Sequence, residues 1–308
     1  MGHGRRRAQG RSRGRGAAAQ GRPGSRDAAA AARRPLDHGD QVRRLLLALL
    51  LAALTGPAAA APRLIWSDEF DGDRLDPARW TAAADCWGGG NEERQCYAAG
   101  NVSVSGGVLR LNARKERASG PARRDGGPRV SRDYASGGVS TKGLASFRYG
   151  RIEVRAKLPL GQGLWPAIWM LPEHDNYGPY PLSGEIDIAE AVNLGVRCRS
   201  CRDRVRGAAH HGPTLQANRS DSADTALGDL TAFHVFALEW TPKRLTWLLD
   251  GKPYFTRPGG RPFDERFHLI LNLAVGGRWA ETTGRRGVDD AALPESLLVD
   301  WVRVYAEN

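Results

Sequence analysis

The stretch Gly184-Glu-Ile-Asp-Ile-Ala-Glu190 places three acidic side chains within six residues and alternates the first two with isoleucine. Alternation with a period of two is typical of a half-buried β-strand, because successive side chains point to opposite faces. The pattern predicts Glu185 and Asp187 on one face of a strand. It places Ile186 and Ile188 on the opposite face, which packs into a core.

Glu190 does not follow this alternation, because a regular strand would place it on the apolar face. Burying an unpaired carboxylate there is costly. One extra residue in the strand, a β-bulge, would return Glu190 to the face of Glu185 and Asp187, and such bulges are frequent next to active sites. The stretch therefore predicts a bulged strand with all three acids on one face.

With a bulge, Glu185 and Glu190 lie about four ladder positions apart, roughly 13 Å between Cα atoms at about 3.3 Å per residue. Their side chains can lean together until the carboxyl groups are about 5 Å apart, the separation found in retaining glycosidases. The charge of Asp187 between them favours a proton on a neighbouring carboxyl group. The alternatives are a solvated acidic face, which like-charge repulsion disfavours, and a calcium-binding strand.

Other segments repeat the strand pattern and are separated by Gly, Pro, Asn and Asp. No segment keeps a convincing helical period. Many short strands with turn residues roughly every ten positions predict an all-β sandwich or barrel. The expected strands include Val102–Val104, Val108–Leu111, Arg151–Lys157, Phe233–Trp240, Leu245–Leu249, Phe267–Val275 and Leu297–Tyr305.

The N-terminal segment has a different composition from the rest of the chain. Residues 1–41 are rich in Arg, Gly and Ala with few large apolar side chains, which predicts a disordered leader. Residues 42–61 combine two arginines, a short apolar run and small residues at the end, as a secretory signal peptide does. The run is shorter than the roughly twenty residues of a membrane span. A translation start at Val42 would remove the leader; a nucleic-acid-binding arm and a buried helix are the alternative interpretations.

The net charge of the chain is +11, and residues 1–61, with 12 Arg and 3 Asp, contribute +9 of it. Residues 62–308 hold the other 33 basic and 31 acidic residues. They are expected to form one catalytic domain, without an overall charge that favours nucleic acid or an anionic membrane. We therefore expect a secreted, extracellular or periplasmic monomer that has neither nucleic acid nor a membrane as a partner.

Four cysteines occur, at positions 86, 96, 198 and 201. In an exported protein they are expected to form disulfides, and four cysteines allow three pairings. Local pairing of Cys86 with Cys96 and of Cys198 with Cys201 is favoured. Zinc binding by the second pair with the two histidines at 210 and 211 is an alternative, although adjacent strand residues point to opposite faces.

The nine tryptophans suggest platforms for sugar rings. Trp165 and Trp169 lie in a Gly- and Pro-containing segment just before the acidic strand, and Trp279 follows two glycines in an expected loop. An indole in such a place can lie against the apolar face of a pyranose, although packing in the protein is an equal alternative. The remaining strand-like positions, Trp80, Trp240, Trp247 and Trp301, are interpreted as core residues.

Several ordered motifs give residues 64–305 a resemblance to glycoside hydrolase family 16, in its laminarinase-like branch. The motifs are Glu185-Ile-Asp-Ile-Ala-Glu190, Trp66-Ser-Asp-Glu-Phe70, Gly90-Asn-Glu-Glu93, Tyr149-Gly-Arg-Ile-Glu153, Gly163-Leu-Trp-Pro-Ala-Ile-Trp-Met-Leu171, Leu271-Asn-Leu-Ala-Val-Gly-Gly277 and Val299-Asp-Trp-Val-Arg-Val-Tyr305.

The resemblance implies an all-β jelly-roll sandwich of two antiparallel sheets, with an open substrate cleft on the concave face. It implies that Glu185 is the nucleophile, Glu190 the acid/base and Asp187 an assisting acid. The positions that correspond to sugar contacts in the family are Asn91, Trp165, Trp169, His210 and Trp279.

The family needs no cofactor for catalysis, but many members bind a structural calcium. The corresponding positions are Glu69, Gly107 and Asp300, the first two through backbone oxygens, and oxygen ligands of this kind suit calcium. The alternative is that Asp300 only caps the last strand. Two departures from the laminarinase pattern lie near sugar subsites and bear on linkage preference: Gly138 stands where Arg is frequent, and Arg278 where Asn is usual.

The sequence therefore predicts a secreted enzyme that cuts β-1,3-glucan internally by a retaining double displacement. A mixed-linkage β-1,3-1,4-glucanase is one alternative, and a non-catalytic β-glucan-binding protein on the same fold is another. A calcium-dependent adhesion or structural domain is a third. The presence of all three acids favours an enzyme, because a binding module does not need two opposed glutamates.

Overall fold

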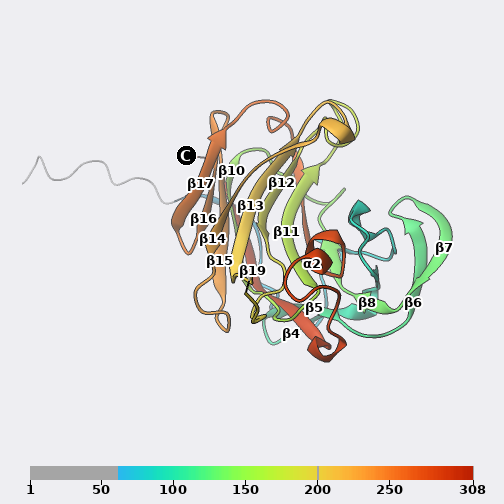
Figure 1. The fold of residues 1–308 in the computed structure, drawn as a ribbon. Helices are drawn as coiled ribbons and strands as arrows, with labels where there is room; N and C mark the ends of the chain where they lie inside the picture. The colour runs from blue at the N-terminus through green and yellow to red at the C-terminus, as the bar shows by residue number, and fades with distance from the viewer. Residues whose placement is uncertain (1–61, 200, 308) are drawn as a thin grey trace, which may run out of the picture. The chain divides into compact units, whose positions relative to one another are not determined.

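A computed structural model describes residues 62–199 and 201–307. The predicted leader (1–41) and signal peptide (42–61) lie outside the described residues. The described chain forms two antiparallel β-sheets that face each other across an apolar core (Figure 1). The predicted all-β sandwich is confirmed.

One sheet has seven strands, and it carries the acidic stretch. Its members are β2 (Thr81–Ala82), β9 (Gly138–Ser140), β11 (Leu164–Pro172), β12 (Glu185–Glu190), β13 (Arg204–His211), β14 (Arg219–Ala226) and β18 (Phe267–Val275). The strand order is β14-β13-β12-β11-β18-β9-β2. The acidic strand β12 therefore lies inside the sheet, between two longer neighbours.

The other sheet has eight strands and packs behind the first. Its members are β1 (Leu64–Asp68), β4 (Val102–Ser105), β5 (Val108–Ala113), β10 (Gly150–Lys157), β15 (His234–Trp240), β16 (Arg244–Leu249), β17 (Lys252–Pro258) and β19 (Glu295–Tyr305). The order is β17-β16-β15-β10-β19-β5-β4, and β1 also pairs with β19. The expected strands Val102–Val104 and Val108–Leu111 are confirmed and pair with each other as the hairpin β4–β5.

Smaller elements lie outside the two large sheets. The hairpin of β6 (Ala118–Arg123) and β7 (Gly126–Arg132) stands at the side of the sandwich (Figure 1). The other small elements are the parallel pair β3 (Gln95–Tyr97) and β8 (Tyr134–Ser136), the 3-10 turns η1 (Gly88–Gly90), η2 (Ala99–Asn101), η3 (Leu215–Ala217) and η4 (Asp290–Ala292), and the helix α2 (Arg278–Thr282). Trp279 lies in α2, so the expectation of a loop there was wrong.

The core explains why these segments become strands. Alternate side chains of the inner strands, such as Val302 and Val304 on β19, are fully buried between the sheets. Strand β18 is buried along its whole length, because side chains cover both of its faces. Burial of apolar surface at about 25 cal/mol per Å² is the main force that holds the two layers together.

Of the tryptophans interpreted as core residues, Trp80, Trp240 and Trp247 are at most 2% exposed. The same interpretation of Trp301 was wrong: its indole is half-buried and the Arg303 guanidinium stacks over it. The register of β19 against β10 shifts at this position. This irregularity turns Trp301 away from the core.

Both predicted disulfides are present, Cys86–Cys96 and Cys198–Cys201, and the described chain has no free cysteine. The pairing leaves no thiolates for the alternative zinc site. Among the described residues, none of the helices is long and apolar enough to cross a membrane.

Candidate active site

The acidic strand β12 contains the predicted bulge. Asp187 pairs with Ala208 and Glu190 pairs with Arg206, so three steps along β12 match two steps along β13. The ladder with β11 shifts at the same place. The extra residue returns Glu190 to the side of Glu185 and Asp187, and we call this side of the seven-stranded sheet the acid-bearing face.

The opposite face of β12 packs into the core. Ile186 and Ile188 are 0% and 1% exposed and contact the eight-stranded sheet. A tryptophan of that sheet, Trp247, donates its indole N–H to the backbone oxygen of Asp187 over 2.7 Å. A hydrogen bond from the second layer thus fixes the backbone at the residue where the bulge begins.

Direct contacts connect the acids to predicted sugar-binding residues. The indole Nε1 of Trp165 donates a hydrogen bond of 2.9 Å to Glu190 Oε1. His210 Nε2 lies 3.1 Å from Asp187 Oδ2. One ligand atom each of Glu185, Asp187 and His210 lie within 4.8 Å of one another. The three acids, Trp165 and His210, which are separated in the sequence, therefore form one compact cluster.

The environment opposes ionisation of this cluster. Burial, followed by the charge of Asp187, holds the pKa of Glu185 well above its usual range. Burial and then the charge of Glu190 do the same for the pKa of Asp187. Three carboxyl groups this close do not all ionise easily, so the cluster retains protons at a pH where a free carboxyl group has lost its own.

The pKa of Glu190 is also raised, mainly by burial. The hydrogen bond from Trp165 and the charges of His210 and Arg206 act in the opposite direction. A carboxyl group that keeps its proton but can release it is suited to general acid catalysis.

Two indoles and an arginine border Glu190. Trp279 meets Trp165 edge-to-face, with ring centroids 5.3 Å apart. The guanidinium of Arg206 lies 5.0 Å from the centroid of the Trp279 ring. Trp165 and Trp279 therefore form a joint aromatic wall on the acid-bearing face.

Trp169 lies on the same face of β11 as Trp165, and a chain of hydrogen bonds extends from its indole. Its Nε1 donates to Asn272 Oδ1 over 2.6 Å, and Asn272 Nδ2 donates to the Tyr97 hydroxyl over 2.9 Å. That hydroxyl lies 3.5 Å from the carboxylate of Glu93. Asn91, exposed on the preceding turn, also bonds to Glu93. The predicted residues Trp169 and Asn91 are thus connected through residues that the sequence did not single out.

Gly277 allows the turn before α2 to approach these side chains. Its φ of +90° suits glycine, and a Cβ there would lie 3.1 Å from Glu93 Cγ and 3.2 Å from a ring carbon of Trp165. The turn is tied down by a hydrogen bond from the Arg278 N–H to the Asn91 oxygen over 2.7 Å. Arg278 itself turns to Glu92 at the surface, 2.7 Å away, so its side chain does not take part in the acid cluster.

The family model described as Beta-porphyranase A-D, GH16 domain, matches residues 64–307. This chain belongs to glycoside hydrolase family 16.

Named relatives of this family 16 hydrolase include a beta-glucanase of Rhodothermus marinus, 42% identical over 264 residues that span 79% of this chain and 84% of the relative. The laminarinase structure from Rhodothermus marinus has a TM-score of 0.68 at 40% identity and covers 81% of this chain and 99% of its own. SCLam, a non-specific endo-beta-1,3(4)-glucanase, has a TM-score of 0.67 at 35% identity over 82% and 95%. These similarities confirm the jelly-roll fold of the hydrolase.

The three predicted calcium ligands lie in the eight-stranded sheet of the hydrolase, not on the acid-bearing face. Asp300 is on β19, Gly107 is in the β4–β5 turn beside it, and Glu69 follows β1, which also pairs with β19. The carboxylate of Asp300 pairs with the guanidinium of Arg155. A cation at this place would have to share or replace that ion pair.

Sequence reasoning missed Glu93, Gln95 and Tyr97 as members of the site. Glu93 is 8% exposed, accepts a 2.7 Å hydrogen bond from Gln95, and has a pKa raised mainly by burial. The signal was present, because Glu93 ends the motif that begins at Gly90. A pattern of residues along one segment, however, does not indicate which distant acid the segment approaches.

Proposed function

We propose that this family 16 hydrolase is a secreted, endo-acting β-1,3-glucanase that works with retention of configuration. The bulge of β12 carries the proposal, because it brings Glu190 to the same face as Glu185 and next to the indole N–H of Trp165. The names of the relatives support the substrate class, since they refer to β-glucan and laminarin hydrolysis.

In this proposal the carboxylate of Glu185 attacks the anomeric carbon and forms a glycosyl–enzyme intermediate. Glu190 protonates the leaving oxygen and then, as a base, activates water for the second displacement. The charge of Asp187 favours a proton on Glu190 before attack, and the charge of His210 favours the ionised form of Glu185 that attacks. In the described part of the chain, His210 Nδ1 has no hydrogen-bond partner, whereas Asp187 Oδ2 lies 3.1 Å from His210 Nε2, a contact that positions the imidazole.

The sugar chain is proposed to lie across the acid-bearing face. Trp165, Trp169 and Trp279 offer indole rings, and His210 and Asn91 offer polar contacts. The link from Trp169 through Asn272 to Tyr97 fixes one indole before substrate binds. Such preorganisation reduces the entropy that binding must offset.

The test is a substrate panel with a matched inactive variant. The protein and its Glu185→Gln variant are incubated with laminarin, barley β-glucan, agarose, porphyran and carrageenan, and new reducing ends are counted. We expect release from laminarin and a loss of at least about 10³-fold in the variant, since a nucleophile has no substitute. Substantial turnover by a clean variant preparation would show that Glu185 is not the nucleophile.

The stereochemistry is tested separately. Proton NMR of the first products from laminarin is expected to show the β-anomer before mutarotation. An initial α-anomer would contradict both the retaining mechanism and the role of Glu185.

Two other functions are tested by the same panel. Faster release from barley β-glucan would indicate a mixed-linkage enzyme, and similar release from both glucans would match the non-specific activity in the name of SCLam. Binding of laminarin without release of reducing ends would indicate a β-glucan-binding protein. Release from agarose or porphyran alone would agree with the description of the matching family model and would keep the mechanism but change the substrate.

The domain boundaries and the export of the chain are also proposals. A signal peptide over residues 42–61 predicts that the exported protein begins at Pro62, and intact mass measurement of the secreted form checks this. A mature protein that retains Arg43 and Arg44 would contradict it.

A structural calcium at Glu69, Gly107 and Asp300 stays a prediction. It is supported by the convergence of three strands at this place, and it competes with the Arg155 ion pair. Calcium bound only by the native state would raise the melting temperature, which EDTA would then lower. A melting temperature that EDTA does not change would contradict the calcium site.

A further inference from the structure

The segment between β12 and β13 has a local excess of positive charge. Residues 197–206 contain five arginines and one aspartate, whereas residues 62–308 as a whole are nearly balanced. Like charges this close repel each other, so the cluster costs stability unless something compensates for it.

The strand pattern directs part of this charge onto the acid-bearing face. Val205 and Ala209 of β13 are buried in the core between the sheets. Because side chains alternate, Arg204 and Arg206 lie on the other face together with His210. Arg206 is directly opposite Glu190 in the ladder, so this group of arginines lies next to the proposed acid/base.

These arginines line a pocket of about 260 Å³. The pocket adjoins the acid-bearing strand through Arg206, which pairs with Glu190 in the ladder, and Trp279 forms part of its lining. Its lining consists of Val192, Asn193, Cys201, Arg202, Arg204, Arg206, Asp224, Trp279, Thr283 and Gly284.

Only one of the three arginine charges in this pocket is matched. Arg206 donates to both carboxylate oxygens of Asp224, over 2.7 and 3.4 Å. Arg202 donates to backbone oxygens only, and both Arg202 and Arg204 are exposed. Within residues 62–199 and 201–307, Arg204 has neither a hydrogen bond nor an ion pair from its side chain. Two guanidinium groups at this pocket therefore remain without a carboxylate.

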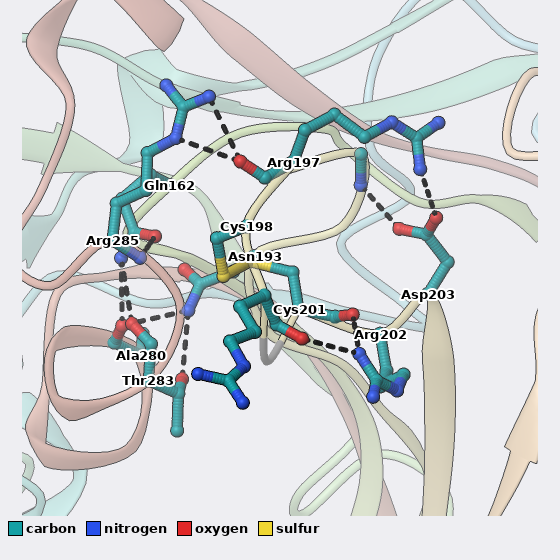
Figure 2. Close-up of a disulfide and its surroundings, with 12 residues drawn as sticks. Gln162, Asn193, Arg197, Cys198, Cys201, Arg202, Asp203, Ala280, Thr283 and Arg285 are labelled. Atoms are coloured by element: carbon teal, nitrogen blue, oxygen red, sulfur yellow. Dashed lines mark hydrogen bonds and ion pairs between the residues drawn. A yellow bond between two sulfur atoms is a disulfide. The ribbon is translucent and has the colours of Figure 1, made fainter.

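The wall that carries Arg202 is braced before any ligand binds. Figure 2 shows the Cys198–Cys201 disulfide and, to its right, Asp203, which accepts hydrogen bonds from the Gly195 N–H over 2.7 Å and from Arg197 over 3.2 Å. On the other side, Asn193 donates to the oxygens of Ala280 and Thr283, 2.9 Å each. The pocket is thus held between a cross-linked loop and α2.

We propose that this arginine pocket binds an anionic substituent, a carboxylate or a sulfate ester, on a sugar of the polysaccharide next to the scissile bond. Guanidinium groups bind both oxyanions through paired, charge-assisted hydrogen bonds. The indole of Trp279 would pack against the ring that bears the substituent. The proposal rests on the proposed function, because it places the substituted sugar beside Glu190 in the same polysaccharide chain.

The experiment compares charged and neutral forms of one polymer. We would measure kcat/KM on laminarin, on carboxymethylated linear β-1,3-glucan and on sulfated laminarin. The variants are Arg204→Gln, the double variant Arg202→Gln/Arg204→Gln, and Arg244→Gln as control. Arg244 is the matched control because it is also an exposed first residue of a strand, in the other sheet. The N-terminal leader is the same in all of them, so its charge cancels in the comparison.

The double variant is expected to lose roughly ten-fold in kcat/KM on at least one charged polymer, with laminarin unchanged, since a charge-assisted hydrogen bond is worth about that factor. The larger loss identifies carboxylate or sulfate as the preferred group. The loss should shrink at about 1 M salt, where screening acts over roughly 3 Å. Equal losses on charged and neutral polymers, or an equal effect of Arg244→Gln, would overturn the proposal.

A binding measurement separates this proposal from the proposed function. In the Glu185→Gln background, quenching of tryptophan fluorescence by sulfated laminarin reports binding without turnover. If no polymer is cleaved but Arg204→Gln still weakens the quenching, the glucanase assignment fails and the anion pocket stands. If laminarin is cleaved but Arg204→Gln changes neither binding nor turnover of charged polymers, the pocket proposal alone fails.

Discussion

At the scale of single residues, the active site depends on how Trp165 tunes Glu190. The indole N–H stabilises the ionised form of the carboxyl group and so lowers its pKa against the stronger effect of burial. If Glu190 is the general acid, its deprotonation sets the alkaline limb of the pH profile.

The substitution Trp165→Phe removes this donor but keeps an aromatic ring. The pKa of Glu190 is expected to rise, so the alkaline limb of kcat/KM on laminarin should move to higher pH, with a several-fold loss at the optimum. Trp279→Phe is the control, since Trp279 touches Trp165 without bonding to an acid. An alkaline limb that moves to lower pH, or that moves equally in both variants, would contradict this role.

Asp187 is expected to destabilise the fold at neutral pH. Burial raises its pKa in the native state above the ordinary value of 3.8. Below about pH 3.8 Asp187 is protonated in both the native and the unfolded state, so it does not reduce the free energy of unfolding. As the pH rises through the native pKa, the buried group must ionise and the free energy of unfolding falls.

The substitution Asp187→Asn removes that cost while it removes activity. We expect the melting temperature at pH 7 to rise by a few degrees, where about 1 kcal/mol corresponds to roughly 2–4 °C in a domain of this size. The gain should vanish near pH 3.5. A variant that is less stable than the parent at pH 7 would show that the contact with His210 outweighs the burial of the charge.

At the scale of elements, the sequence predicted the regular strands well. The bounds of β18 agree exactly with the expected Phe267–Val275, because nine consecutive residues combine strand formers with turn signals on both sides. The bulge of β12 was predictable because an acid fell on the wrong face. The hairpin β6–β7 was missed, since its Gly-, Pro- and Arg-rich residues have no apolar alternation and pair mostly through the backbone.

The two layers are coupled at the bulge by Trp247. Its N–H binds the Asp187 oxygen, whereas the equally buried Trp240 donates to the backbone oxygen of Phe263, away from the acids. Neither contact was visible in the sequence, because each joins residues that are more than twenty positions apart.

The pair of variants Trp247→Phe and Trp240→Phe tests this coupling. Each should cost about 1–3 kcal/mol in urea unfolding, since each leaves a buried carbonyl without its donor. Only Trp247→Phe should also reduce kcat on laminarin beyond the effect of lost stability. Equal kcat values in the two folded variants would mean that the bulge does not need this hydrogen bond.

At the scale of the whole molecule, two short covalent loops supplement a large core. The Cys86–Cys96 loop spans ten positions and the Cys198–Cys201 loop spans three. In the chain-entropy model these loops correspond to about 3 and about 2 kcal/mol, respectively. Both free energies are small compared with the free energy gained by burying apolar surface between the two sheets.

Removal of each disulfide should therefore weaken the fold without abolishing it. Replacing Cys86 and Cys96 by Ala is expected to cost about 3 kcal/mol or more, because both sulfurs are also buried. Replacing Cys198 and Cys201 should cost about 2 kcal/mol. Urea titrations at constant m-value check which disulfide contributes more to stability. A larger cost for the second pair would show that its loop also stabilises neighbouring parts of the fold.

The bulge also bears on how the gene can change. Glu190 stands five positions after Glu185, and the extra residue corrects for the odd number. A single-codon deletion at Ala189 would shorten the spacing to four, and an even spacing returns to the same face without a bulge. An insertion or deletion usually disrupts a buried strand, because it moves the following side chains to the other face. This strand can place the same three acids on one face at two lengths, with the bulge and without it. A one-residue change in length at this place is therefore compatible with the same active site.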